Sequence, residues 1–95
     1  MPRRMKQGLV IPDELVALIW GMHPHLKKQV RAALRDILEN SAAGKPLKAE
    51  LAGLYSYRIG TYRIIYRVRE HIELVAVGPR ASIYQLTTRL VKNSS

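Results

Sequence analysis

The sequence contains no cysteine and no long apolar run, and each absence excludes a class of protein. Without cysteine the chain cannot be a disulfide scaffold, a zinc ribbon or a cysteine-dependent enzyme. No apolar run approaches the ~20 residues that a membrane-spanning helix needs. Leu9-Val10-Ile11 is too short for the core of a signal peptide, and Gly44-Lys45-Pro46 lacks the spacing of a phosphate-binding loop. We therefore expect a soluble, cytoplasmic protein.

Acidic residues are also scarce, and positive charge dominates. The 95 residues include 16 Lys and Arg against 7 Asp and Glu, which gives a formal net charge of +9. A compact cation of this strength accumulates at polyanions, such as nucleic acid, an anionic membrane face or an acidic protein. The length fits one domain over residues 1–95, and a hydrophobic fraction of 47% argues against disorder.

The N-terminal half of the sequence predicts a short strand followed by two helices. The strand is expected over residues 5–11, and a short helix follows, capped by Asp13 and broken at Gly21. A longer helix is expected over residues 24–39, because its apolar side chains form one stripe and a proline stands in its first turn.

The C-terminal half changes to the period of two that is typical of strands. Residues 40–46 are expected to form a loop. Three strands are expected over residues 54–59, 62–67 and 72–77, and Gly78-Pro79 is expected to end the last of them. A short helix over residues 82–91 would place Ile83, Leu86 and Leu90 on one side. The fold class is therefore α+β: an N-terminal strand and two-helix hairpin packed on one face of a small, mostly antiparallel sheet, with a short C-terminal helix.

Gly60-Thr61 predicts a two-residue hairpin between the first two of these strands. Counting outward from that turn collects six apolar and aromatic side chains on one face, which we expect to pack on the helices: Tyr55, Tyr57, Ile59, Tyr62, Ile64 and Tyr66. On the other face Arg58 opposes Arg63, with Arg67 nearby, and no acidic residue occurs between residues 51 and 69. Opposed like charges destabilise a sheet. The arginines on this face therefore lack an anionic partner in the nearby sequence, and phosphate is the anion that guanidinium groups bind best.

A plainer interpretation of these arginines stays open beside this one. Exposed strand arginines are common and can pair with distant acids such as Glu73 or Asp36. The tyrosines are expected in the core rather than as base-stacking platforms. Four cations on the longer helix are expected to form a solvated face, with a nucleic-acid footprint as the second possibility: Lys27, Lys28, Arg31 and Arg35. His23 and His25 are a weak metal signal, and no metal site is expected.

Two motifs stand out in this part of the chain. The first runs Leu47-Lys48-x-x-Leu51-x-Gly53-x-Tyr55-Ser56-Tyr57-Arg58-x-Gly60-x-Tyr62-Arg63-Ile64-Ile65-Tyr66, and the second is Val77-Gly78-x-Arg80-x-x-x-Tyr84. The pair is more specific than either motif alone. Together they resemble the RelE/ParE superfamily of bacterial and archaeal type II toxins, and the likeness covers most of the chain.

The resemblance implies a compact α+β toxin with a curved sheet, neutralised by an antitoxin that wraps it. RelE-like members cleave mRNA in the ribosomal A site, whereas ParE-like members poison DNA gyrase. By motif position, the resemblance assigns catalytic roles to Arg63, Arg80 and Tyr84. RNA binding is expected of four further cations: Lys45, Lys48, Arg58 and Arg67.

Cleavage of RNA without a metal uses the 2′-hydroxyl as nucleophile, and it needs a base, an acid and cations for the developing charge. The two catalytic arginines suit charge stabilisation. Some RelE-like enzymes carry lysines where this chain has Leu54 and Ser56, and others carry a histidine where it has Pro79. The base is therefore open between Tyr84, Arg80 and the ribosome.

The leading hypothesis is a ribosome-dependent, metal-independent endoribonuclease toxin. A gyrase inhibitor of the same fold, or an inactive remnant that only binds an antitoxin, are the alternatives. The expected partners are a cognate antitoxin with an acidic segment, the ribosome and mRNA, with no cofactor, metal or membrane. The hypothesis requires Arg63 and Arg80 to converge on an exposed surface, each without a carboxylate of its own chain.

Overall fold

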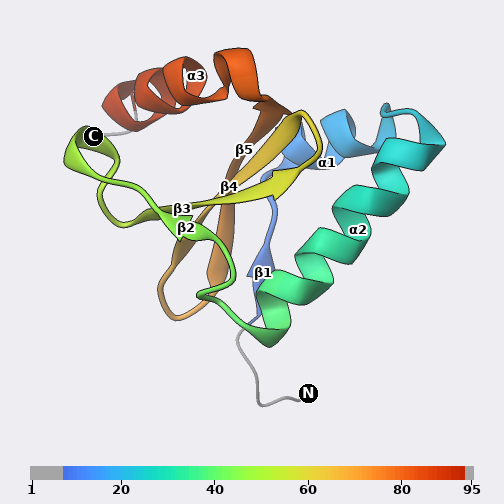
Figure 1. The fold of residues 1–95 in the computed structure, drawn as a ribbon, viewed down its shortest axis with the longest axis horizontal. Helices are drawn as coiled ribbons and strands as arrows, with labels where there is room; N and C mark the ends of the chain where they lie inside the picture. The colour runs from blue at the N-terminus through green and yellow to red at the C-terminus, as the bar shows by residue number, and fades with distance from the viewer. Residues whose placement is uncertain (1–7, 94–95) are drawn as a thin grey trace.

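A computed structural model describes residues 8–93 and shows one five-stranded sheet in the order β1-β5-β4-β3-β2 (Figure 1). The strands are β1 (Leu9–Val10), β2 (Lys45–Pro46), β3 (Leu54–Ile59), β4 (Tyr62–Val68) and β5 (Ile72–Pro79). Neighbouring strands are antiparallel except that β1 runs parallel to β5. The expected α+β fold with a mostly antiparallel sheet is confirmed.

Three helices and one short 3-10 turn accompany the sheet: α1 (Asp13–Trp20), α2 (Pro24–Glu39), α3 (Arg80–Asn93) and η1 (Ala49–Leu51). In Figure 1, α2 lies along one side of the sheet and α3 along the opposite side. Among residues 8–93 no helix is long and apolar enough to cross a membrane. The sheet is therefore covered on both faces, by α1 and α2 on one and by α3 on the other.

The larger core lies between α2 and the sheet. Four side chains of α2 are buried there: Val30, Ala33, Leu34 and Ile37. They pack with the hairpin residues Ile59, Ile64 and Tyr66 and with Ile72, Leu74 and Val77 of β5. Each fully buried side chain of this size contributes about 1.5–3 kcal/mol. The apolar face of the hairpin therefore packs on the helices, as predicted from the register.

A second, smaller core lies under α3, on the arginine face of the sheet. It consists of Leu54, Ile65, Ala76 and Ile83. A bulge makes it possible: Ile65 pairs with Ala76, but Tyr66 pairs with Leu74, so Val75 is an extra residue in β5. The alternation of β5 side chains between the two faces of the sheet shifts by one residue at this bulge. Leu74 therefore faces the larger core, while Ala76 faces the smaller one.

Boundaries in the N-terminal half differ from the predictions in two places. The first strand covers only Leu9–Val10, and residues 5–7 of the prediction lie outside the described residues. Asp13 is the first helical residue and not the cap. The cap is Pro12, whose carbonyl accepts hydrogen bonds from the backbone N–H of Leu15 at 2.9 Å and Val16 at 3.0 Å. Proline fits this place because its fixed φ suits a helix start and its missing N–H costs nothing there.

Boundaries in the C-terminal half differ in three places. Residues 45–46, predicted as loop, form β2 and pair with β3. Gly78-Pro79 does not end β5, because a proline at the last strand position removes no hydrogen bond within the ladder. α3 starts at Arg80, and its buried residues are Ile83 and Thr87, whereas Leu86 and Leu90 are exposed. Thr87 can be buried because its hydroxyl donates a 2.7 Å hydrogen bond to the carbonyl of Ile83.

Candidate active site

The site is built where the β3–β4 hairpin meets the first turn of α3. Arg58 and Arg63 are opposed in the hairpin, as predicted, and Gly78 of β5 lies beside Arg63 on its other side. A Cβ atom on Gly78 would lie 3.2 Å from the Cδ1 atom of Ile83, so glycine lets α3 lie close to the sheet here. The helix therefore begins beside the arginine pair.

The turn of the hairpin fixes the start of α3. The backbone N–H of Arg80 donates a 2.7 Å hydrogen bond to the carbonyl of Thr61. The turn and the helix start enclose an open hollow of about 550 Å³, lined by Arg58, Gly60, Thr61, Arg63, Pro79, Arg80 and Ala81. Two arginines from the sheet and one from the helix thus line the same hollow, which we call the arginine hollow.

Tyr84 lies one helical turn after Arg80, on the same side of α3. Its phenol oxygen is 3.1 Å from the Oγ atom of Ser56 in β3. The hydrogen bond with Ser56 lowers the pKa of Tyr84 below that of an ordinary tyrosine, and the guanidinium of Arg63 and the charge of Arg80 act in the same direction against the opposing effect of burial. Tyr84, Arg63 and Arg80 therefore form one electrostatic cluster.

The arginines of the hollow have no acidic partner in the part of the chain that the structure describes. Within residues 8–93 no carboxylate lies within ion-pair distance of Arg58, Arg63 or Arg80. The Nη1 atom of Arg63 instead faces the carbonyl oxygens of Tyr62 at 3.3 Å and Gly60 at 3.5 Å. No group of three His, Asp or Glu side chains in the described part of the chain could hold a metal ion. The guanidinium groups of the hollow can therefore accept an anion from outside the described part of the chain.

Lys45 extends this cationic surface across the sheet. It pairs with Ser56 in β2–β3 register, so its side chain lies on the face of the sheet that carries Ser56 and Arg58 and that Tyr84 of α3 contacts. The Tyr66 hydroxyl holds the preceding loop by accepting a hydrogen bond from the N–H of Gly44 at 2.8 Å and donating one to the carbonyl of Ser41 at 2.9 Å. This pair of bonds explains why residues 45–46 form a strand.

The structure separates the other two predicted RNA-binding residues from the hollow. Lys48 is exposed at the start of η1 and does not line the hollow. Arg67 shares the face of Arg63, but it lies four residues further along β4, roughly 13 Å away by strand geometry, with the buried Ile65 between them. It forms an ion pair with Glu73 at 3.4 Å. The plainer interpretation of a strand arginine, pairing with a distant acid, therefore describes Arg67.

Ser56 is the residue of the candidate site that the sequence analysis did not assign. It stands inside the first motif, on the arginine face, and is nearly buried. A serine at that place in a strand of large side chains is the signal that could have identified it. Its partner Tyr84 is 28 residues away, so the pairing becomes visible only once α3 is known to cross that face.

The sequence matches, over residues 17–84, the family described as ParE toxin of type II toxin-antitoxin system, parDE. Toxin RelG of Mycobacterium tuberculosis is 51% identical over 45 residues, which are 44% of this chain and 52% of that protein. Toxin RelE of the same organism is 35% identical over 46 residues, 45% of this chain and 47% of that protein. The chain thus spans about half the length of these curated relatives.

Solved structures share the fold over most of the chain. The RelBE2 toxin-antitoxin complex of M. tuberculosis contains a chain with a TM-score of 0.69 and 27% identity, covering 80% of this chain and 100% of that one. A mutant of E. coli RelE in the free state gives a TM-score of 0.74 at 18% identity, covering 94% and 98% of the two chains, which is a likeness of fold alone. Since the family match covers more than half of its length, the chain belongs to the ParE toxin family of type II toxin–antitoxin systems, within the RelE/ParE superfamily that its motifs resemble.

Proposed function

We propose that the protein is a ribosome-dependent endoribonuclease toxin that cleaves mRNA at the arginine hollow. The observation that supports this most directly is the convergence of Arg63 and Arg80 on one open hollow without a neutralising carboxylate within residues 8–93. Both arginines also act on the nearby phenol of Tyr84 and lower its pKa. Unpaired guanidinium groups around an open hollow suit a phosphodiester, because each offers planar, charged donors to its oxygens.

The geometry supports a mechanism in which Tyr84 is the base. Its lowered pKa makes the phenolate more accessible than in an ordinary tyrosine. The phenolate takes the proton of the RNA 2′-hydroxyl, and the 2′-oxygen attacks the adjacent phosphorus. The bond from phosphorus to the 5′-oxygen breaks, and the leaving oxygen takes a proton from solvent. The products are a 2′,3′-cyclic phosphate and a 5′-hydroxyl, and Tyr84 returns its proton to solvent.

The arginines stabilise the charge that develops during this attack. Arg63 and Arg80 reach the hollow from different elements, so they can contact different non-bridging oxygens of one phosphate. Arg58 lines the hollow opposite Arg63, and Lys45 lies further along the same face; both bind neighbouring phosphates of the strand. None of these steps uses a metal bound to the toxin.

Dependence on the ribosome follows from the openness of the hollow. A shallow cationic surface attracts RNA but does not by itself hold a 2′-hydroxyl in line with the phosphorus, and that alignment is worth several orders of magnitude in rate. A ribosome that holds mRNA in a fixed conformation supplies it. The partners are therefore mRNA, the ribosome in the cytoplasm, and an antitoxin; two structures similar to this chain, from M. tuberculosis and Pyrococcus horikoshii, are a toxin-antitoxin complex and a RelE-RelB complex.

The test is primer extension on a defined mRNA, incubated with the purified protein, with and without programmed ribosomes. Cuts that require ribosomes and leave 5′-hydroxyl ends are expected. Cleavage of naked RNA at the same rate would contradict the role of the ribosome, and intact mRNA in both reactions would contradict the endoribonuclease.

Gyrase inhibition is the second candidate, and the ParE description of the matched family favours it. A supercoiling assay with purified gyrase separates the two: inhibition with intact mRNA selects the second candidate. Induced expression that leaves growth unchanged would instead select an inactive toxin that only binds an antitoxin.

A further inference from the structure

Helix α1 is apolar over most of its length, yet none of its residues is buried. Leu15 and Ile19 pack against the larger core. Both flanks of the helix face water: Leu18 is 46% exposed on one flank, and Val16 and Trp20 are 37% and 72% exposed on the other. A helix that is apolar on several sides normally lies in a protein interior or in a membrane. α1 therefore exposes apolar surface that the described part of the fold does not cover.

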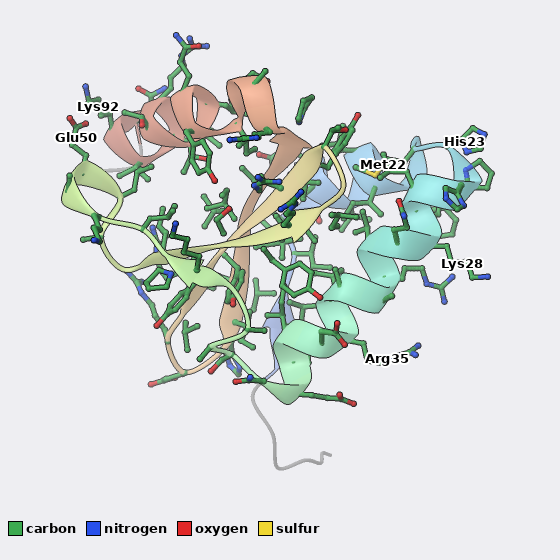
Figure 2. The ribbon with its side chains drawn as sticks, in the orientation of Figure 1. Met22, His23, Lys28, Arg35, Glu50 and Lys92 are labelled. Atoms are coloured by element: carbon green, nitrogen blue, oxygen red, sulfur yellow. The ribbon has the colours of Figure 1, made fainter. Side chains whose placement is uncertain are left out.

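The neighbouring helix α2 borders this apolar surface with four cations, which we call the cationic stripe: Lys27, Lys28, Arg31 and Arg35. They line one open depression of about 500 Å³. Figure 2 shows Lys28 and Arg35 pointing from α2 away from the sheet. Within residues 8–93 no ion pair involves any of the four. Lys27 with Arg31, and Arg31 with Arg35, repeat like charges at a spacing of four residues, which destabilises a helix. An external layer of negative charge would relieve this repulsion.

Apolar surface and positive charge meet at Trp20, the only tryptophan of the chain. The Nζ atom of Lys27 lies 4.7 Å from the centre of the indole ring. The acidic residues of α1, Asp13 and Glu14, stand in its first turn, about 10 Å along the axis from Trp20. An aromatic ring beside cations, at the end of an apolar helix, is typical of proteins that contact a lipid–water interface.

Different partners would cover this surface to different extents. A nucleic acid would meet the cations of α2 but would leave Val16 and Leu18 in water. A second copy placed over the same surface would bring a second cationic stripe beside the first, and like charges repel. A helix from another protein would cover one flank of α1 and leave the other, because Leu18 and Trp20 lie on different flanks. An anionic bilayer surrounds an inserted helix and presents a continuous layer of phosphates, so it covers both features.

We propose that α1 and the cationic stripe form a surface that binds anionic phospholipid membranes. α1 lies in the interface, with Leu18 and Trp20 at the level of the headgroups, and the cations of α2 contact the lipid phosphates. With a length of about 12 Å, α1 is too short to cross a hydrocarbon core of about 30 Å, so the protein lies on the membrane. The sequence did not predict this partner, because the open flanks of α1 become visible only once the helix is placed on the sheet.

Trp20 reports directly on this surface, because no other tryptophan contributes to the fluorescence. The probe is a suspension of vesicles made of phosphatidylglycerol and phosphatidylcholine in equal parts, and vesicles of phosphatidylcholine alone are the control. The mixed vesicles are expected to shift the Trp20 emission to shorter wavelength and to protect the ring from acrylamide quenching. Each cation near an anionic surface contributes about fivefold in affinity, so binding to the control vesicles is expected to be about 100-fold weaker or worse.

A matched pair of double variants separates this surface from the net charge. Each substitution of Lys or Arg by Glu changes the charge by two, so both double variants lower the formal net charge from +9 to +5. Lys28→Glu with Arg35→Glu is expected to weaken vesicle binding by about 30-fold or more. Lys48→Glu with Arg89→Glu, at exposed positions outside α1 and α2, is expected to change it much less.

A second pair tests the apolar part of the surface. Leu18→Asn is expected to weaken vesicle binding by about tenfold, because the side chain no longer gains from leaving water. Leu86→Asn is the control, since Leu86 of α3 is exposed to a similar extent, 40% against 46%. Circular dichroism checks that both variants remain folded.

Several results would overturn the proposal. Unchanged Trp20 emission with the mixed vesicles would exclude insertion of α1. Equal loss of binding in the two double variants would show that net charge accounts for the attraction. A Trp20 shift caused by duplex RNA or by rising protein concentration, with none caused by vesicles, would identify a nucleic acid or a second copy as the occupant. None of these readouts involves mRNA cleavage, so the inference goes beyond the proposed function and is tested separately from it.

Discussion

The Oγ atom of Ser56 and the phenol oxygen of Tyr84 lie 3.1 Å apart, and this contact joins strand β3 to helix α3 near Arg63 of the arginine hollow. The hydrogen bond adds to the packing of Tyr84 against the smaller core in fixing the position of its ring. It also favours the ionised phenol, together with Arg63 and Arg80. The predictions about catalysis depend on this contact and on the two guanidinium groups beside it.

Replacing Tyr84 by phenylalanine removes the proposed base and leaves the ring. Cleavage of mRNA on programmed ribosomes is expected to fall by roughly 100-fold or more, as when a general base is lost. Tyr55→Phe is the matched control, because the Tyr55 ring stacks on Tyr66 on the far side of the sheet, at a centroid distance of 5.3 Å. Single-turnover rates at saturating ribosomes measure the effect, and equal rates for both variants would contradict the role of Tyr84.

The pH dependence of cleavage tests the hydrogen bond between Ser56 and Tyr84. A base must be deprotonated, so the rate is expected to rise with pH through the pKa of Tyr84, which lies below the ordinary value for tyrosine. Ser56→Ala removes the largest cause of that shift. The pKa of Tyr84 then rises, and the profile moves to higher pH. A profile that does not move in this variant would show that the titrating group is not Tyr84.

Arg63→Ala and Arg80→Ala each remove a cation from the hollow. Each is expected to lower the cleavage rate by about 100- to 1000-fold, the usual cost of removing a donor that stabilises a developing anion. Growth arrest on induction is expected to disappear with it. Arg67→Ala is the matched control, since Arg67 pairs with Glu73 at 3.4 Å outside the hollow. Undiminished toxicity in both hollow variants would place the active site elsewhere.

Lys45→Ala tests the extension of the cationic surface along the sheet. Because Lys45 lies in register with Ser56 and meets a neighbouring phosphate in the proposed complex, its loss is expected to raise KM and leave kcat almost unchanged. The salt dependence of binding is expected to weaken by about one phosphate contact. Lys48→Ala is the comparison, because Lys48 lies at the start of η1 and not in a strand of the sheet. A loss confined to kcat would mean that Lys45 acts on the reaction and not on binding.

The hairpin could be predicted in full from the sequence because its turn fixes its register. Once Gly60-Thr61 is the loop, each pair follows by counting, and all six pairs from Ile59–Tyr62 to Leu54–Arg67 occur. A shift by one residue would move every apolar side chain to the arginine face. The opposed pair Arg58–Arg63, and with it half of the hollow, was therefore contained in local sequence.

What could not be predicted depends on contacts between distant segments. The bulge at Val75 has no marker in an apolar run, yet it turns Ala76 toward α3 and makes room for the second core. The separation of Arg67 from the hollow depends on Ile65 being covered by that helix. Strand β2 forms because the hydroxyl of the fully buried Tyr66 bonds to the loop before it. Each of these features results from tertiary packing, which the alternation of apolar and polar residues along the sequence does not reveal.

Tyr66→Phe tests that last relationship. The Tyr66 hydroxyl bonds to Gly44 and Ser41 in a buried place, and its loss is expected to lower the free energy of unfolding by about 1–3 kcal/mol. Tyr57→Phe is the matched control: its hydroxyl donates a 2.7 Å hydrogen bond to Asp36, but in an exposed position, so about 1 kcal/mol or less is expected. Urea unfolding followed by circular dichroism measures both.

The same variant separates stability from function. If Tyr66 holds β2 in place, its loss loosens the strand that carries Lys45, and binding of mRNA is expected to weaken while the pH profile set by Tyr84 stays unchanged. Gly44→Ala provides an independent route, since a Cβ atom there would lie 2.7 Å from the Tyr66 hydroxyl oxygen and 3.1 Å from the carbonyl oxygen of Ser56. Wild-type mRNA binding in both variants would show that the position of Lys45 does not depend on Tyr66.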